Sequence, residues 1–143
     1  MNQELLIIKD EFLRYLYEIS EMKMVHYIAT FIQGEEALIL RLVINGPMTP
    51  KELSDDLKIT KGRVTAIINK LKKKNYLHIK INEDDRRSII VWLTDYGREA
   101  FQEKLDIADQ YFNKMFSVLG VEDARSLVGE ISKLLIKLKE AGL

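Results

Sequence analysis

One stretch of the sequence, residues 60–74 (TKGRVTAIINKLKKK), limits most strongly what this chain can fold into. Its apolar residues recur at intervals of three, four and seven, which is the spacing of one buried face of a helix. The residues on this predicted buried face are Val64, Ile67, Ile68 and Leu71. The opposite face has small residues near the helix start, Gly62 and Ala66, and longer side chains that can donate hydrogen bonds further on, Asn69 and Lys73. The pattern predicts a helix held by a protein core on one side and open on the other.

The charge of this helix favours an anionic partner. Lys61 and Arg63 lie in the first turn, where the helix dipole disfavours cations by roughly 0.3–1 kcal/mol each. A nucleic-acid phosphate reverses that sign, because helix N-termini and cations both attract it. Residues 58–82 contain eight basic residues and no acidic one. The alternative interpretation is a solvated charged face, the usual fate of such a run.

Charge is also distributed unevenly along the whole chain. The 143 residues have no net charge, but residues 51–87 hold eleven basic and six acidic residues, which leaves the remainder acidic. A basic middle between acidic flanks indicates a local site for a polyanion. The chain has no cysteine, which excludes disulfides and thiolate metal sites. No apolar run approaches the roughly 20 residues of a membrane span, and the first residues lack a secretion signal, so we expect no membrane association and a cytoplasmic location.

The segments before the basic helix predict a helix-turn-helix. Residues 2–24 have the pattern of a long amphipathic helix, and residues 25–33 either extend it or bend into the next element. Gly34 is a predicted break, followed by a short helix over residues 35–44. Thr49, Pro50 and Glu52 form a capping box with proline at the first helical position. After this short helix and a tight connection at residues 58–59, Thr60 caps the basic helix.

The segments after the basic helix predict a hairpin and two further helices. Residues 76–81 and 88–93 have strand patterns, with the polar tip NEDDRR between them. A polar hairpin tip is commonplace, but directly after a helix-turn-helix it is typical of a wing. An arginine there can enter a narrow minor groove, and Asp85 is placed to hold Arg87. Helices are expected over residues 95–119 and 122–141, separated at Gly120.

The order of helix-turn-helix, wing and long helix resembles the multiple-antibiotic-resistance-regulator (MarR) family of winged-helix repressors. The matching stretches are NGPMTPKELSDDLKITKGRVTAIINKLKKKNYL and DDRRSIIVWLTDYG. The family's wing pattern is met by Asp85, Arg87, Leu93, Thr94 and Gly97. The chain departs from the family at Asn75, where a glycine is frequent, and at Ala66, where a long polar or basic side chain is frequent.

We therefore predict a mostly α protein with a small β-hairpin wing. A winged helix-turn-helix DNA-binding lobe is expected over residues 34–93, and a helical dimerisation region over residues 1–33 and 94–143. The resemblance implies a homodimeric transcriptional regulator, a repressor, that binds a palindromic operator in double-stranded DNA and responds to an unidentified small molecule. The alternative is a winged-helix protein–protein interaction module without DNA binding. No catalytic motif is present, so we expect no enzyme and no cofactor.

Two sets of residues follow from this interpretation. We expect Thr65 and Asn69 to read base edges, with the cations on or near phosphates. The full predicted DNA-binding set is Thr49, Thr60, Lys61, Gly62, Arg63, Thr65, Asn69, Lys70, Lys73, Asp85, Arg86 and Arg87. A candidate ligand pocket would be lined by Met22, Tyr27, Phe31, Tyr111 and Phe112, for which plain hydrophobic core is the alternative interpretation. No metal site is predicted, because His26 and His78 are far apart in the sequence.

Overall fold

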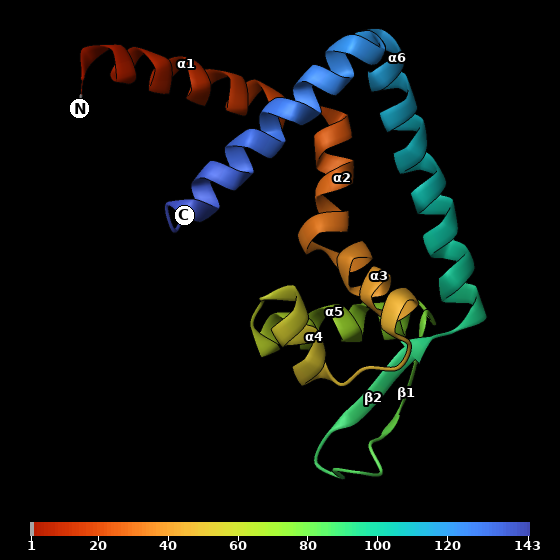
Figure 1. Ribbon diagram of the computed structural model, residues 1–143. Helices are drawn as coiled ribbons and strands as arrows, with labels where there is room; N and C mark the ends of the chain where they lie inside the picture. Colours follow the sequence, from red (N-terminus) through yellow and green to blue (C-terminus); the bar gives the residue numbers. More distant parts are fainter. Residues whose placement is uncertain (1) are drawn as a thin grey trace. The chain divides into compact units, whose positions relative to one another are not determined.

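A computed structural model describes residues 2–143, which form six helices and two strands (Figure 1). In chain order these are α1 (Gln3–Ser20), α2 (Lys23–Gln33), α3 (Glu35–Asn45), α4 (Pro50–Leu57), α5 (Lys61–Lys73), β1 (Leu77–Ile81), β2 (Ile89–Leu93) and α6 (Asp95–Glu140). The chain divides into two compact units, one ending at Leu105 and the other comprising Asp106–Leu143. The predicted fold class, mostly α with a β-hairpin wing, is confirmed.

The first predicted helix is wrong in its extent. A single helix over residues 2–24 is expected, but α1 ends at Ser20 and α2 begins at Lys23. Met22 between them has an extended backbone, with φ −71° and ψ 137°. The Ser20 hydroxyl donates a 2.6 Å hydrogen bond to the Tyr17 carbonyl, which is a local competitor of helix continuation. Residues 25–33 therefore lie in a second helix, which ends before Gly34 as predicted.

The core of the first unit joins α3, α4, α5, the hairpin and the start of α6. All four apolar residues predicted for the inner face of the basic helix are buried in it. The core residues are Leu38, Ile39, Leu42, Met48, Leu53, Val64, Ile67, Ile68, Leu71, Leu77, Val91, Leu93 and Phe101. Val43, which the pattern also places inward, is exposed instead. The core thus fixes α5 along one face only.

The hairpin is antiparallel and continuous with this core. Leu77 of β1 lies opposite Leu93 of β2. Met48 adds a short bridge to β2, because its backbone N–H and carbonyl both bond to Val91, at 3.0 and 2.9 Å. The segment before α4 is therefore tied to the same sheet that carries the wing.

The Leu-Thr-x-x-Gly segment joins the end of α5 to the start of α6. The Thr94 hydroxyl donates to the Asn75 carbonyl at 2.8 Å and accepts from the Gly97 N–H at 2.9 Å. A Cβ at position 97 would lie 2.4 Å from the Tyr76 carbonyl oxygen, so only glycine fits. Asn75 has a positive φ of 61°, a conformation that asparagine tolerates as glycine does.

The second unit consists of the remainder of α6, from Asp106 onward. Gly120 interrupts the helix with φ 79° and ψ 164°, which confirms the predicted break. The segment after this break carries a row of exposed apolar side chains: Val121, Leu127, Val128, Ile131, Leu134, Leu135 and Leu138. In the first unit, α1 buries no residue and exposes its own apolar side chains, which include Leu5, Ile8, Phe12, Leu16 and Ile19.

Two positions on α3 test the location of the core. Leu38 is fully buried, whereas Ile44 on the same helix is 66% exposed. We expect Leu38→Ala to lower the free energy of unfolding by about 2–5 kcal/mol, because it leaves a cavity. Ile44→Ala is the matched control and should change it by less than about 0.5 kcal/mol. Denaturant unfolding measures both, and equal losses would contradict this placement of the core.

Candidate nucleic-acid interface

The outer face of α5, which belongs to the predicted site, is open to solvent. Thr60 caps the helix by accepting a 3.2 Å hydrogen bond from the Arg63 N–H. Every residue predicted for the outer face is exposed, as is Thr65 beside it. The outer-face residues are Gly62, Ala66, Asn69 and Lys73. The first turn contains no acidic residue. A helix N-terminus with cations and small side chains is thus presented to solvent, the arrangement that lets a helix approach a phosphate backbone.

Helix α4 precedes α5 as in a helix-turn-helix. The Thr49 hydroxyl accepts from the Glu52 N–H at 3.2 Å, and the Glu52 carboxylate accepts from the Thr49 N–H at 3.3 Å, so the predicted capping box is confirmed. Lys58 ends α4 in the left-handed conformation, with φ 54°. The Ser54 hydroxyl donates to the Ile59 carbonyl at 2.6 Å and holds the tight connection. Thr49 and Thr60 therefore each have a structural role as a helix cap.

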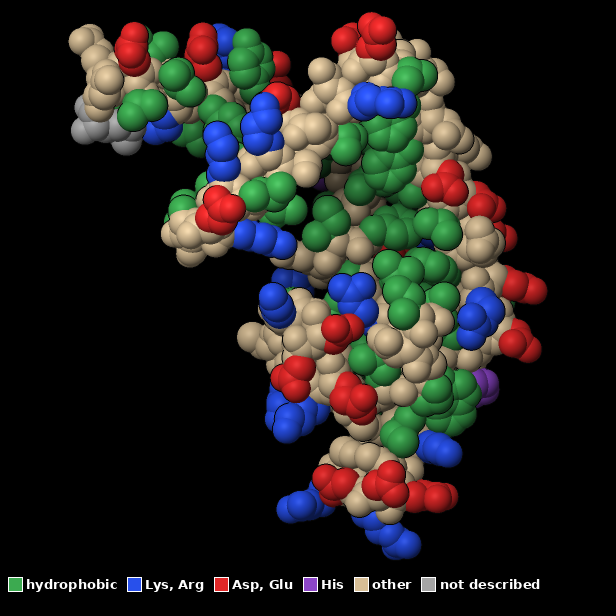
Figure 2. Space-filling model, viewed as in Figure 1, with side chains coloured by type: hydrophobic (Ala, Val, Ile, Leu, Met, Phe, Trp, Pro, Cys, Tyr) green, Lys and Arg blue, Asp and Glu red, His purple; other side chains and the backbone are tan. Residues whose placement is uncertain are grey.

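The hairpin tip carries charges of both signs, as Figure 2 shows at the bottom of the view. The exposed residues there are Glu83, Asp84, Asp85, Arg86 and Arg87. One carboxylate oxygen of Asp85 accepts from the Arg87 backbone N–H at 3.1 Å and from its Nε at 3.4 Å. The predicted contact between these two residues is therefore present, and the rest of the Arg87 guanidinium is strongly exposed.

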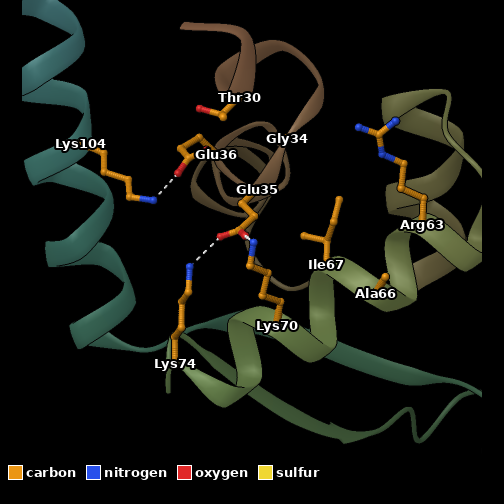
Figure 3. A pocket seen from close by; sticks show the side chains of 10 residues that line it. All are labelled: Thr30, Gly34, Glu35, Glu36, Arg63, Ala66, Ile67, Lys70, Lys74 and Lys104. Atoms are coloured by element: carbon orange, nitrogen blue, oxygen red, sulfur yellow. Dashed lines mark hydrogen bonds and ion pairs between the residues drawn. The ribbon is translucent and has the colours of Figure 1, made fainter. Parts of the chain in front are cut away.

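Two cations of the predicted DNA-binding set lie on a flank of α5 rather than on its outer face. Lys70 forms a 2.6 Å ion pair with Glu35 at the start of α3. The Arg63 guanidinium donates to the Gln33 carbonyl at 3.2 Å. Both line a pocket of about 500 Å³ with residues of α2, α3 and the beginning of α6 (Figure 3). This pocket has no counterpart among the sites predicted from the sequence.

Two adjacent acids organise the pocket. Glu35 pairs with Lys70 and, at 3.0 Å, with Lys74, while Glu36 pairs with Lys104 of α6. Adjacent residues on a helix are expected to point apart. They do point apart, each toward a different helix. The sequence holds no local signal for these contacts, since they join residues 35 to 68 positions apart.

The ion pairs shift the pKa values of these groups. Burial raises the pKa of the Glu35 carboxyl, but hydrogen bonds from Lys70 and Lys74, together with their charges, outweigh burial and hold it below its usual value. Burial likewise opposes the hydrogen bonds that Glu36 accepts from Lys104 and Thr30, and the net pKa of Glu36 is lowered. Burial lowers the pKa of Lys104, but the hydrogen bond to Glu36, together with the charges of Glu36 and Glu35, outweighs burial, and the net pKa is raised. Both acids are therefore held in the charged form.

The predicted ligand-pocket residues fall in both units. In the first unit, Tyr27 donates to the Lys104 carbonyl at 3.0 Å, Phe31 lies 6.0 Å from the Phe101 ring, and Met22 precedes α2. The other two, Tyr111 and Phe112, belong to the second unit, where Phe112 stacks on Phe116. Phe31 packs against the core of its unit, as the alternative interpretation expects. The pocket itself stays a prediction.

Residues 2–143 contain no cluster of three or more histidine or acidic side chains suited to a metal ion. Over the same residues, no helix is both long enough and apolar enough to span a membrane.

Comparison with known proteins identifies the family. Residues 36–112, more than half of the chain, match the model of the winged helix DNA-binding domain. The uncharacterized HTH-type transcriptional regulator YkoM of Bacillus subtilis (strain 168) is 28% identical over 117 residues, which are 79% of this chain and 69% of that protein.

Two solved structures show the same fold. A MarR transcriptional regulator from Methanosarcina mazei Go1 superimposes with a TM-score of 0.65 at 24% identity, covering 94% of this chain and 98% of the other. The transcriptional repressor CouR, bound to a 23-mer DNA duplex, superimposes with a TM-score of 0.70 at 20% identity, covering 93% of this chain and 96% of the other.

The fold and the open face of α5 define a winged-helix protein in which the outer face of α5 and the hairpin tip are both exposed to solvent. The chain belongs to the winged helix DNA-binding domain family. Its fold is that of the MarR transcriptional regulator from Methanosarcina mazei Go1. The relatives reported above are named as transcriptional regulators, in agreement with the prediction that the chain is not an enzyme.

The Glu36–Lys104 pair makes stability depend on pH. Glu36 is nearly buried, and Glu36→Gln should lower the free energy of unfolding at pH 7 by about 1–2 kcal/mol, the lower part of the usual range, because Lys104 is partly exposed. The folded-state pKa of Glu36 is depressed, so its contribution is present above the unfolded value of about 4.3 and is lost as pH falls through the folded value.

Urea unfolding at several pH values between 3 and 7 measures this difference. The exposed Glu103→Gln on α6 is the control and should have little effect throughout. A Glu36→Gln deficit that is as large at pH 3 as at pH 7 would contradict the role of the charged pair.

Proposed function

We propose that this regulator acts as a homodimer on a palindromic site in duplex DNA, with α5 in the major groove and the hairpin tip in the minor groove. The observation that carries this proposal is the outer face of α5, which is exposed and free of acid while its inner face is fixed in the core. Such a helix can enter the groove without disturbing the fold. Regulation by repression is part of the proposal, supported by the name of CouR as a repressor.

The proposed assembly uses both ends of the chain. Helix α1 and the segment of α6 after Gly120 each expose a row of apolar side chains longer than a soluble surface ordinarily carries. Figure 2 shows hydrophobic side chains uncovered along α1, at the upper left. We propose that residues 1–33 and 94–143 supply the dimer interface, residues 34–93 supply the DNA-binding lobe, and the protein works in the cytoplasm, where its DNA lies.

A small-molecule response is a further part of the proposal. Its basis is the aromatic group formed by Tyr27 and Phe31 beside Phe101 in the first unit. A ligand that binds one dimer shape better than another would shift the population of shapes and, through it, the affinity for DNA.

The salt dependence of binding tests the proposal against a protein–protein module. Neutralising phosphates releases counterions, so the logarithm of the binding constant should fall steeply with the logarithm of salt concentration. A module that binds only another protein would leave duplex DNA unbound or bind it weakly with a shallow slope.

The recognition helix gives a paired prediction. Asn69→Ala should weaken binding to the preferred site by roughly 1–3 kcal/mol with little effect on random DNA, because asparagine reads a base edge. Lys73→Ala should weaken binding to the preferred site and to random DNA alike, since Lys73 is proposed to contact phosphate. It should also reduce by ~1 the steepness of the salt slope, which is the slope of the logarithm of the binding constant against the logarithm of salt concentration. Fluorescence anisotropy titrations on both DNAs measure these effects. Equal losses on both DNAs for Asn69→Ala would refute its role in base reading.

The wing gives a second paired prediction. Arg87→Ala should cost more affinity than Arg86→Ala, because Asp85 orients the Arg87 side chain. The difference should be largest on sites with A·T-rich flanks, where the minor groove is narrow. Asp85→Ala should act in the same direction but more weakly, since it leaves the charge of Arg87 in place. Unchanged binding by Arg87→Ala at physiological salt would leave the hairpin with a structural role only.

The dimer is tested by adding charge to the apolar rows. Phe12→Lys or Leu135→Lys should shift the protein from dimer toward monomer at micromolar concentration, because the new charge is costly to bury. Gln3→Lys, at the start of α1, adds the same charge outside the apolar row and should leave the dimer intact. Sedimentation velocity measures all three, and a parent protein that is wholly monomeric would exclude this assembly.

A further inference from the structure

Glu35 lies where it can compete with DNA for the cations of α5. Its two carboxylate oxygens each bond to a different lysine, at 2.6 Å to Lys70 and at 3.0 Å to Lys74 (Figure 3). The Glu35 side chain is only 15% exposed, so water does not readily replace these partners. It also stands in the first turn of α3, where the helix dipole favours a negative charge. The carboxylate is therefore fixed, and the lysines are drawn to it.

The lysines themselves remain accessible from solvent. Lys70 is 65% exposed even when paired, and around the axis of α5 it lies about 60° from Lys73, a predicted phosphate contact. A long, flexible lysine at that position can reach either the carboxylate of Glu35 or a phosphate alongside the helix. One ammonium group does not serve both as a close ion pair, because phosphate and carboxylate repel each other.

We propose that Glu35 limits the sequence-independent affinity of this protein for DNA by holding Lys70 and Lys74 away from phosphates. The inference rests on the proposed function, in which α5 binds duplex DNA. Glu35 acts as a positioning residue: it touches no base, but it determines how many cations of α5 release counterions on binding. Phosphate contacts carry no sequence information, so their number sets the overall affinity and the salt dependence rather than the preferred site.

The experiment measures binding to random duplex DNA between 50 and 200 mM salt for the parent and Glu35→Gln. Glutamine keeps the shape and removes the charge, so Lys70 and Lys74 are released. The salt slope should steepen by about 0.9 for each lysine that then contacts phosphate, and affinity at the lowest salt should rise about 3- to 10-fold. If the ion pair has only a structural role, Glu35→Gln should instead have the same salt slope as the parent and should bind DNA more weakly.

A second variant distinguishes a purely structural role of Glu35 from the proposed role of holding lysines away from phosphates, even if Glu35→Gln is less stable. This inference revises the phosphate contact that the sequence predicts for Lys70. Lys70→Met should leave the salt slope of the parent unchanged, because Lys70 is held by Glu35, but should lower the slope of Glu35→Gln by about 0.9. Lys73→Met is the control and should lower the slope in both backgrounds. Glu36→Gln, which removes the neighbouring acid but frees no lysine of α5, should leave the slope as in the parent.

The outcomes distinguish this inference from its premise. A lower slope for Lys70→Met in the parent background would show that Lys70 already contacts phosphate, and would overturn the inference. A parent that binds with a steep slope and a Glu35→Gln variant with the same slope would overturn it as well, while leaving DNA binding intact. A parent that binds no duplex DNA would overturn both the inference and the proposed function.

Discussion

The burial of one face of α5 is the interaction on which the rest of the structure depends. Val64 and Leu71 are fully buried against a core supplied by α3, α4 and the hairpin. The opposite face of α5 does not pack against the core. It can therefore carry small residues, Asn69 and a lysine without loss of stability. The hairpin is fixed by the same core through Leu77 and Val91. Helix and wing are therefore held by one set of apolar contacts.

A second layer of interaction is electrostatic and lies beside this core. Glu35 and Glu36, consecutive in sequence, bond to α5 and to the start of α6 respectively. Burial raises the pKa of both carboxyl groups, and their lysine partners lower it further than burial raises it. Each acid therefore depends on its lysines to stay charged. We propose that the Glu35 carboxylate beside the basic helix limits how strongly that helix attracts a polyanion.

The sequence contained much of the fold, because the periodicity of α5, the capping box at Thr49 and the glycine breaks act locally. The sequence also predicted the Asp85–Arg87 contact, because residues two apart at a hairpin tip can lie on the same face of the hairpin. It placed the end of the first helix wrongly, because Ser20 competes for the backbone through its own hydroxyl. The sequence predicts a phosphate contact for Lys70 but gives no sign of its ion pair with Glu35, since a contact across 35 positions leaves no trace in local spacing.

The central claim is that two copies of α5 read a symmetric site in duplex DNA. Selection of bound sequences from a library of random duplex DNA tests it most directly. We expect enrichment of an inverted repeat whose half-sites are separated by about one helical turn, 10–10.5 base pairs, or a multiple of it. Enrichment of a single asymmetric half-site would contradict the dimeric account, and recovery of unselected sequence at moderate salt would contradict sequence-specific binding altogether.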